Sequence, residues 1–439
     1  MLQNLLINVR DAVWGFPLLA FIVGVGATAT IGLYFIQFRK FFSSWKLIFA
    51  KQEGSTGEIS PFNAFLNVLS TSLGNGALAG IAVAIHTGGP GAVFWIFMFG
   101  FFAMILRFAE VYLATSFSSI SKTGRILGGP FLYLQQLPGG KYLPYIYATM
   151  CLAYAFFSGT AMQCNSIVAV LGKVTPLSPW VIGSVLTLFI CYTLLGGSQR
   201  IIKASSILVP LKVVLFFFFC SGVLLYHWAA LPAAIMLIIK AAFNPQAVAG
   251  SVAGLSIMRV FSISVTKTVN ASEAGLGTAA VIYGSTGSKD PLSNSLTAML
   301  GTFISLNLVC TMVALSIVVS GALASGETGA ALTSVAFQSV FGVFGAWVVS
   351  LLSVLFGIGV FVAYGFVGRQ CWFFLTNDKF EHLFTLLFCA ISFWGAVADV
   401  SVVWATIDLV NAGNLIINLS AILYLIPFIR AQLCSTLTR

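Results

Sequence analysis

Long apolar runs, separated by short polar or charged stretches, dominate this chain from residue 14 onward. A helix that crosses the hydrocarbon of a bilayer needs about 20 predominantly apolar residues. Runs of about that length lie near residues 14–36, 62–86, 91–118, 144–171, 179–196, 206–228, 246–266, 292–320, 338–375, 383–399 and 402–428. The pattern therefore predicts an all-α integral membrane protein with about 11 transmembrane helices.

The second of these runs carries two glycines, Gly74 and Gly76, on either side of Asn75 near its centre. Glycine weakens a helix, and hydrocarbon offers no water to replace lost backbone hydrogen bonds. A break there exposes N–H groups that suit a carboxylate and carbonyl groups that suit a small cation. The same glycines also fit a closely packed face between two helices, so this segment alone leaves both interpretations open.

Composition supports the membrane assignment and excludes other classes. The 439 residues are 59% hydrophobic and only 7% charged, whereas a soluble protein carries roughly 25% charged residues. The net charge of +10 does not indicate nucleic acid, because the basic residues lie in short loops between apolar runs. The eight cysteines are scattered without a C-x-x-C pair, which is typical of small buried side chains and not of a disulfide framework or a metal site.

The distribution of basic residues predicts the orientation in the membrane. If the loop after the first helix, with Arg39 and Lys40, lies in the cytoplasm, then about fifteen of the 21 Lys and Arg residues face that side, Lys267 among them. Arg107, Lys212 and Arg259 fall within or at the ends of spans. We therefore predict a multi-pass protein of the cell (inner) membrane with its N-terminus outside and its C-terminus in the cytoplasm.

The order of the spans also predicts an internal repeat. With the first helix set aside, two sets of about five helices remain, and an odd number per set inverts the second relative to the first. The predicted parts are an N-terminal extra helix and cytoplasmic loop (1–58), a first repeat (59–230) and a second repeat (231–439). Each set opens with a glycine-interrupted span, which in the second contains Gly250, Ser251 and Gly254. Matching interruptions in two halves indicate a transporter binding site.

Polar residues inside the spans are the candidate functional side chains. The amides of Gln163 and Asn165 both donate and accept, which suits an amino-acid ligand or a hydrogen bond between helices equally well. Arg107 and Glu110 lie three residues apart, so we expect them to pair, as a structural salt bridge in preference to a gate. Glu273 is expected either to cap a short helix or to belong to an inner gate.

Motifs of enzymes and pumps are missing from the sequence. The stretch 284–289 lacks the spacing of a Walker A loop, so ATP-driven transport is not predicted. The three histidines, His86, His227 and His382, lie far apart and are expected at helix ends. No pairing of His, Asp or Cys at motif spacing supports a membrane-embedded enzyme, and unique broken helices do not fit the repeated lining of a channel pore. Secondary transport without a cofactor is the leading prediction.

Several motifs follow one another along nearly the whole chain: Ser60-Pro61-Phe62 leading into Gly74; Gly88-Gly-Pro-Gly-Ala-Val-Phe-Trp95; Arg107-Phe-Ala-Glu110; Gly128-Gly-Pro130; Gln163-Cys-Asn-Ser166; Ser272-Glu-Ala-Gly-Leu-Gly277; and Trp404 with Asp408 and Asn411. Together they resemble the alanine/glycine:cation symporter family, the bacterial sodium:alanine symporters. The resemblance implies a leucine-transporter-type 5+5 inverted repeat preceded by one extra helix. It also implies import of alanine, glycine or D-alanine with a cation by alternating access.

The resemblance also assigns roles to residues. The substrate partners that it implies are Gly74, Asn75, Gly76, Ala77, Gln163, Asn165, Gly250, Ser251 and Gly254. The cation partners that it implies are Ser72, Leu73, the backbone of Gly76, Gly359 and Val360. The other expected partners are a small neutral amino acid and the lipid bilayer, with no nucleic acid, and the sequence does not give the oligomeric state.

One departure from the family concerns the coupling ion. Gly359 and Val360 align with a Ser-Thr pair whose hydroxyls bind sodium in related folds, so this chain lacks those ligands unless Ser350 or Ser353 replaces them. Sodium is the leading prediction for the coupling ion, and a proton-coupled transporter of the same fold is the alternative. That alternative needs a titratable group near the site, and the sequence places no acidic residue there.

Overall fold

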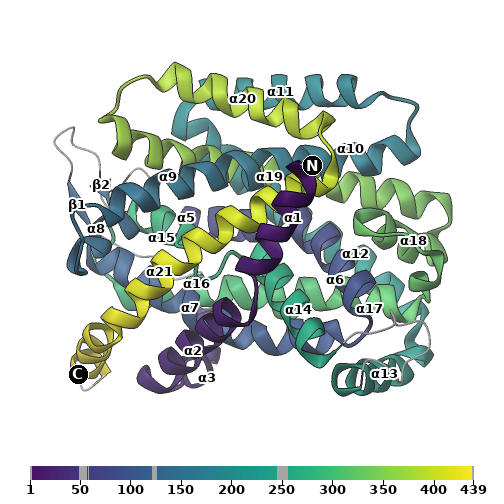
Figure 1. Ribbon diagram of the computed structural model, residues 1–439, viewed down its shortest axis with the longest axis horizontal. Helices are drawn as coiled ribbons and strands as arrows, with labels where there is room; N and C mark the ends of the chain where they lie inside the picture. Colours follow the sequence, from purple (N-terminus) through teal and green to yellow (C-terminus); the bar gives the residue numbers. More distant parts are fainter. Residues whose placement is uncertain (1, 49–56, 58, 121–125, 245–255, 438–439) are drawn as a thin grey trace.

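The computed structural model describes residues 2–48, 57, 59–120, 126–244 and 256–437, and these are almost entirely helical (Figure 1). In this part of the chain the only sheet is a two-stranded antiparallel one, in which β1 (Ser119–Ile120) pairs with β2 (Ile126–Leu127). The predicted all-α class is therefore confirmed.

The helices of the N-terminal half are α1 (Leu2–Val13), α2 (Phe16–Gly32), α3 (Ile36–Arg39), α4 (Phe41–Ile48), α5 (Pro61–Ser72), the π-helical η1 (Gly76–Gly80), α6 (Ile81–Gly88), α7 (Ala92–Ser116), α8 (Pro130–Tyr133), the short η2 (Leu134–Gln136), α9 (Leu143–Phe156), η3 (Phe157–Ala161), α10 (Met162–Val174), α11 (Pro179–Leu195) and α12 (Gly197–Tyr226).

The helices of the C-terminal half are η4 (Trp228–Ala230), α13 (Leu231–Phe243), α14 (Ile257–Ser272), α15 (Thr278–Gly284), α16 (Pro291–Phe303), η6 (Ile304–Cys310), α17 (Thr311–Val319), η7 (Ala322–Ser325), α18 (Gly329–Phe341), α19 (Val343–Thr376), α20 (Glu381–Val397) and α21 (Val400–Leu437).

Length and apolar composition identify the helices that can cross a membrane. Among the described residues six qualify alone: Ala92–Ser116, Leu143–Val174, Ala204–Tyr226, Pro291–Val319, Val343–Thr376 and Val402–Ser435. The bent pair formed by α5 and residues 76–88 qualifies as one more span, and five apolar helices are shorter. The protein is therefore a multi-pass membrane protein, and the total of about 11 spans in an inverted repeat stays a prediction.

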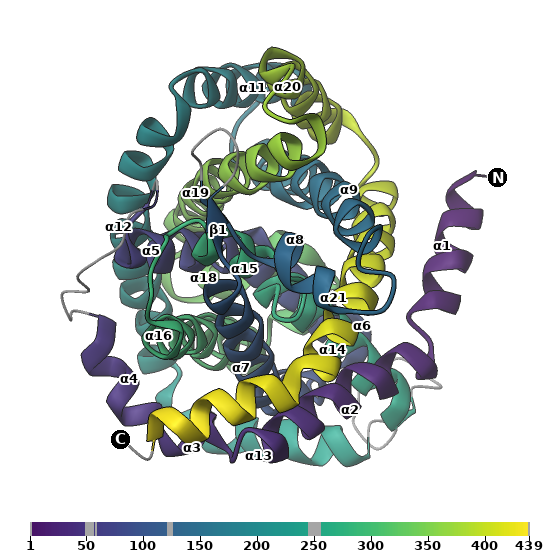
Figure 2. The same ribbon diagram turned by 90° about the vertical axis from the view of Figure 1, so that its left-hand side faces the viewer.

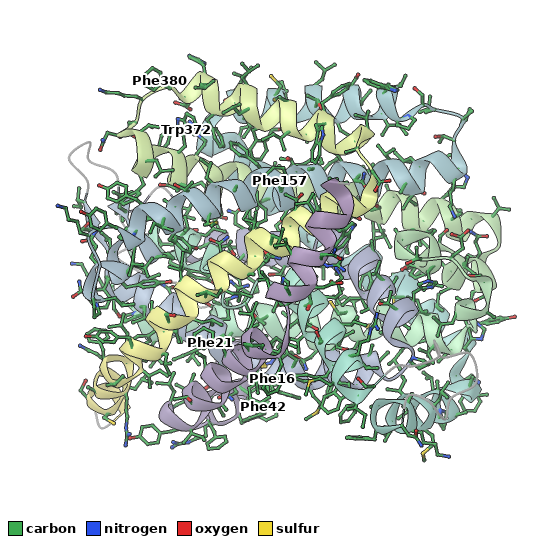
Figure 3. The ribbon with its side chains drawn as sticks, viewed as in Figure 1. Phe16, Phe21, Phe42, Phe157, Trp372 and Phe380 are labelled. Atoms are coloured by element: carbon green, nitrogen blue, oxygen red, sulfur yellow. The ribbon has the colours of Figure 1, made fainter. Side chains whose placement is uncertain are left out.

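The outer surface is apolar on several sides. Helices α11 and α20 lie side by side along one edge in both views, with α13 at the opposite edge (Figures 1 and 2). Phe380 and Trp372 lie near the first edge, and Phe16 and Phe42 lie toward the other (Figure 3). Large apolar side chains are also exposed elsewhere, such as Phe218 at 70%. So much exposed apolar surface fits lipid better than water.

Two sequence-based placements are settled by the helix boundaries. His86 lies in the last turn of α6, His227 directly follows α12 and His382 lies in the first turn of α20, so the histidines are at helix ends as predicted. The placement of Lys267 in a cytoplasmic loop is wrong, because the residue lies within α14. Its charge is tolerated there because Asp408 on α21 pairs with it at 3.3 Å.

The centre of the molecule is built around two long helices. Helix α7 packs along α16, α14 and α15, and helix α19 packs against α12, α10 and α9. Helix α5 lies between these groups, in contact with α12, α19 and α16. Residues 63–82 are almost completely buried, which places the glycine-interrupted segment in the protein interior and away from lipid.

Candidate functional site

The predicted helix break at Gly74 and Gly76 is present. Helix α5 begins with Pro61 and is capped by the Ser60 hydroxyl, which accepts a hydrogen bond from the Asn63 N–H. It ends at Ser72, and the chain resumes helical structure with the π-helical turn η1. The two halves are bent by 40° relative to each other. Glycine at the junction lowers the cost of leaving the helix.

A second break lies at residues 273–277, between α14 and α15. Glu273, Gly275 and Gly277 all have positive φ angles, of 60°, 85° and 82°. Left-handed backbone is easily adopted by glycine, and a glutamate in that conformation marks a sharply constrained end of α14. In the sequence this break coincides with the Glu-Ala-Gly-Leu-Gly motif. The sequence analysis predicted the second interruption elsewhere, at Gly250, Ser251 and Gly254, and these residues lie outside the described residues.

The two breaks lie against each other. The Ser72 hydroxyl donates to the Ser272 carbonyl at 3.2 Å. A Cβ atom on Gly76 would lie 3.2 Å from the Asn270 carbonyl oxygen and 3.3 Å from the Ala271 Cα. The backbone of α14 therefore approaches η1 so closely that a side chain at position 76 has no free space.

Gln163 and Asn75 hold the first break in place. The Oε1 atom of Gln163 accepts the Asn75 backbone N–H at 3.0 Å, so the amide occupies one of the N–H groups at the break. The Asn75 side chain donates to the Ser353 carbonyl at 3.2 Å and accepts from the Ser353 hydroxyl at 2.7 Å. The break is thereby fixed between α10 on one side and α19 on the other.

We expect Asn75→Ala to destabilise the break by about 1–3 kcal/mol, because the buried carbonyl and hydroxyl of Ser353 lose their partner. The thermal unfolding midpoint in detergent measures the effect. Ser353→Ala removes only the hydroxyl and leaves the bond to its carbonyl, so its effect should be smaller, about 1 kcal/mol. Equal effects of the two changes would show that the amide of Asn75 is not the anchoring group.

Asn165 and the two candidate serines point to other partners. The Asn165 amide donates to the Gly395 and Ala398 carbonyls, both at 3.0 Å, so it joins α10 to the end of α20, away from the break. The hydroxyl of Ser350 donates to the Ala346 carbonyl one turn earlier in its own helix. The Ser353 hydroxyl donates to Asn75, so both serines give their proton to protein acceptors, and their replacement of the missing Ser-Thr pair stays a prediction.

Arg107 and Glu110 form the expected ion pair in α7. The Nη1 atom of Arg107 lies 2.6 Å from Oε1 of Glu110, and neither side chain is exposed to solvent. Arg107 also donates to the Thr302 hydroxyl at 3.2 Å and to the Ser272 carbonyl at the end of α14. The pairing predicted from the i, i+3 spacing is confirmed, and its arginine reaches the second helix break.

The second oxygen of Glu110 binds the second break directly. Oε2 accepts the backbone N–H groups of Gly275 at 3.1 Å and Gly277 at 3.0 Å, together with the side-chain amide of Asn418 on α21 at 3.2 Å. Glu273 is also buried, and one of its carboxylate oxygens accepts from the Thr278 hydroxyl at 3.1 Å, at the start of α15. Two buried carboxylates thus fix the loop between α14 and α15.

A third buried charge cluster surrounds Asp408 on α21. Besides Lys267, the Asn270 amide donates to its carboxylate at 2.5 Å. The Lys267 ammonium lies 4.6 Å from the centre of the Trp404 ring. Because Asn270 also lies beside Gly76, this cluster borders the first break from the side of α14 and α21.

Gly359 and Val360 face the first break, but a lysine stands beside them. A Cβ atom on Gly74 would lie 2.6 Å from Cγ2 of Val360, so α19 packs directly on the break. A Cβ atom on Gly359 would lie 2.6 Å from Nζ of Lys212 on α12. Sequence reasoning placed Lys212 in or at the end of a span and gave it no role, although a single lysine within an apolar run was the available signal.

Comparison with known proteins identifies the family of this chain. The model of the sodium:alanine symporter family matches residues 1–436 of the chain. The chain belongs to the sodium:alanine symporter family. It is similar to the sodium/alanine symporter AgcS of Methanococcus maripaludis, with 32% identity over 96% of this chain and 94% of that protein. It is also similar to an uncharacterized transporter of Haemophilus influenzae, with 31% identity over 96% of this chain and 93% of that protein.

This member of the sodium:alanine symporter family is a transporter and not an enzyme. A solved structure of a Na+-coupled sialic acid symporter in a substrate-bound outward-open state covers 94% of this chain and 98% of its own, with 13% identity and a TM-score of 0.30, a score too low to establish a common fold. All eight cysteines are free, and the described residues contain no group of three or more His, Cys, Asp or Glu placed to hold a metal ion.

Proposed function

We propose that this symporter imports small neutral amino acids, namely alanine, glycine and D-alanine, together with a cation by alternating access. The observation that carries the proposal is the pair of adjoining helix breaks, at residues 73–75 and 273–277, in the buried centre of the protein. Broken helices at mid-membrane present N–H groups and carbonyl groups that match the two charged ends of an amino acid. The name of the archaeal sodium/alanine symporter AgcS supports the choice of alanine.

In this proposal the substrate carboxylate meets N–H groups of the segment Gly74–Ala77, and the amine meets carbonyl groups of the two breaks. Gln163 contributes because its side chain already holds the Asn75 N–H and can exchange that bond for one to the substrate. Gly250, Ser251 and Gly254 stay predicted partners outside the described residues. The contacts of Asn165 with α20 favour a role in helix packing.

The movement belongs to the same proposal. The two predicted repeats, 59–230 and 231–439, change their relative positions and open the site to one side at a time. The N-terminus lies outside and the C-terminus in the cytoplasm of the cell membrane. Family membership favours sodium as the cation, with the proton as the second candidate.

Counterflow in proteoliposomes tests the transport class. Vesicles that contain the purified protein are loaded with unlabelled alanine, and the entry of labelled alanine is followed. A carrier with alternating access exchanges the two, so internal alanine should accelerate entry of the label. A channel or an enzyme gives no such acceleration, and its absence would contradict the proposal.

We expect the site to select by side-chain size. Glycine and D-alanine should compete with labelled alanine at similar concentrations, whereas leucine should need at least about tenfold more, a difference of about 1.4 kcal/mol in binding. The reason is the tight packing at Gly74 and Gly76, where even one added carbon contacts α19 or α14. Leucine that competes as well as glycine would exclude a site at these glycines.

A further inference from the structure

Lys212 is a buried charge on α12, a helix of which most residues lie at the surface of the protein. Within the span Ala204–Tyr226, only 28% of its 18-residue apolar stretch is buried inside the protein. Lys212, in contrast, has no exposed surface. The helix therefore turns this one long basic side chain into the protein. An ionisable residue inside a membrane protein is costly to bury, so it marks a functional site unless a partner explains it.

The partners of Lys212 are oxygen atoms at the end of α5. Its Nζ atom donates to the Leu73 carbonyl at 2.9 Å, the Ser70 carbonyl at 3.1 Å and the Ser70 hydroxyl at 3.2 Å. An ammonium has three N–H donors, and these three acceptors match them. The Phe356 ring lies 5.4 Å away, and within the described part of the chain no carboxylate forms an ion pair with Lys212.

These oxygen atoms form the kind of site that binds a small cation. The C-terminal end of a half-helix carries partial negative charge on its last carbonyl groups. At the break the Ala77 N–H donates to the Gly74 carbonyl at 3.0 Å, and the Leu73 carbonyl is turned toward Lys212. Carbonyl groups at a broken helix coordinate sodium in transporters built this way, so the ammonium lies where a coupling ion is expected.

Gly359 links the lysine to the missing sodium ligands. The family resemblance aligns this glycine with a serine, and a Cβ atom here would lie 2.6 Å from both the Lys212 Nζ and the Ser70 hydroxyl oxygen. That separation is shorter than real Cβ contacts, so a serine at 359 would require the Lys212 ammonium to leave its present position. The absence of a side chain at 359 therefore gives the ammonium its place beside Ser70.

We propose that the ammonium group of Lys212 takes the place of a sodium ion at the first helix break, and that the cation carried with the amino acid is the proton of this ammonium. The inference rests on the proposed function, because it names the coupling ion of that same site. When the site is open to the outside, the neutral amine binds a proton. When it is open to the cytoplasm, the ammonium releases that proton to water and the neutral amine remains.

The elements packed against α12 offer no acidic side chain to share this proton. Helices α5, α17 and α18 carry no titratable residue. The others contribute Cys191 and Tyr192 on α11, Tyr364, Arg369 and Cys371 on α19, and Arg200, Lys203, Cys220 and Tyr226 on α12 itself. Arg369 pairs with Glu381 on α20. Lys212 is thus the titratable group that binds the Leu73 carbonyl at the first break. Asp408, which borders the break from α21, is paired with Lys267, and the carboxylates of Glu110 and Glu273 bind the second break.

Uptake by the unmodified protein decides the coupling ion. Labelled alanine uptake into proteoliposomes is measured with sodium or choline outside, at two external pH values, with the membrane potential clamped. We expect sodium removal to change uptake by less than about twofold, and each unit of inward pH gradient to raise alanine accumulation by up to about tenfold for one proton per substrate. A tenfold loss in choline, or accumulation that ignores the pH gradient, would overturn the inference. Absence of counterflow would instead overturn the proposed function.

Variants then assign the effect to the lysine. Lys212→Met should abolish accumulation driven by pH, by at least about tenfold, while counterflow continues. Lys240→Met, at an exposed lysine on α13, is the matched control and should behave as the unmodified protein. The triple variant Lys212→Ala, Gly359→Ser, Val360→Thr restores the hydroxyl groups and should gain stimulation by sodium. Persistence of pH-driven accumulation in Lys212→Met would contradict the proposal. If that variant does not fold, the uptake measurement on the unmodified protein, with sodium or choline outside, decides the coupling ion.

Discussion

Gly76→Leu is expected to reduce alanine uptake by at least about a hundredfold while the protein still inserts into the membrane. The first carbon of the new side chain would already lie 3.2 Å from the Asn270 carbonyl oxygen and 3.3 Å from the Ala271 Cα, and a leucine adds three more carbons beyond it. These neighbours are backbone atoms of α14, which cannot move aside as a flexible side chain does. The first break must then separate from the second, and the proposed substrate groups lose their alignment.

A second glycine in the same chain provides the control. Gly24 on α2 is exposed, and nothing lies within 4 Å of a Cβ atom built on it. Gly24→Leu makes the same chemical change in a membrane helix, so it should leave uptake close to that of the unmodified protein. Transport is measured at matched amounts of each variant in the membrane. Normal uptake by a well-inserted Gly76→Leu variant would place the substrate site elsewhere and favour the interpretation of Gly76 as a simple packing position.

The first break could be predicted because its cause is local. Two glycines around Asn75 weaken a helix whatever its neighbours are, and the apolar run that surrounds them defines the membrane setting. The pairing of Arg107 with Glu110 was predictable for the same reason, since residues three apart share a helix face. Both predictions needed only the chain within one helix.

The contacts between helices could not be read in this way. Gln163 and Asn165 are two residues apart, so they point about 200° apart around a helix with 3.6 residues per turn. The sequence does not say which of the two faces the break, and the structure shows that Gln163 does while Asn165 contacts α20. Lys212 and Ser70 are 142 positions apart, so their contact depends entirely on how α12 packs against α5.

The second break shows a different limit. Its glycines were noticed as part of a family motif, but the run of apolar residues at 246–266 suggested that the interruption lay earlier, at Gly250. The structure shows that α14 continues to Ser272 and that Lys267, which looked like a loop residue, lies within it and pairs with Asp408. A charge is a reliable end marker for a membrane helix only when no partner of opposite charge is packed against it.

Removing the arginine from the buried ion pair is expected to have the largest effect on stability. Arg107→Met leaves the Glu110 carboxylate buried without its counter-ion, which typically costs about 3–5 kcal/mol. Lys173→Met removes the basic partner of an exposed pair, in which Lys173 lies 2.7 Å from Glu327 with side chains 50% and 41% exposed. That change should cost at most about 1 kcal/mol, because water already solvates both groups. Thermal unfolding in detergent, followed for both variants, measures the difference.

A double variant distinguishes the charge from the hydrogen bonds. If the cost of Arg107→Met comes from the unpaired carboxylate, then adding Glu110→Gln should recover part of the lost stability, because a neutral amide no longer needs a counter-ion. The recovery should be incomplete, since Oε2 of Glu110 accepts the N–H groups of Gly275 and Gly277 and a neutral amide oxygen accepts them more weakly than a charged carboxylate. A double variant less stable than Arg107→Met would show that Glu110 acts chiefly by holding the second break, with the arginine secondary. Equal stability of Arg107→Met and Lys173→Met would show that the buried pair contributes no more than a surface one.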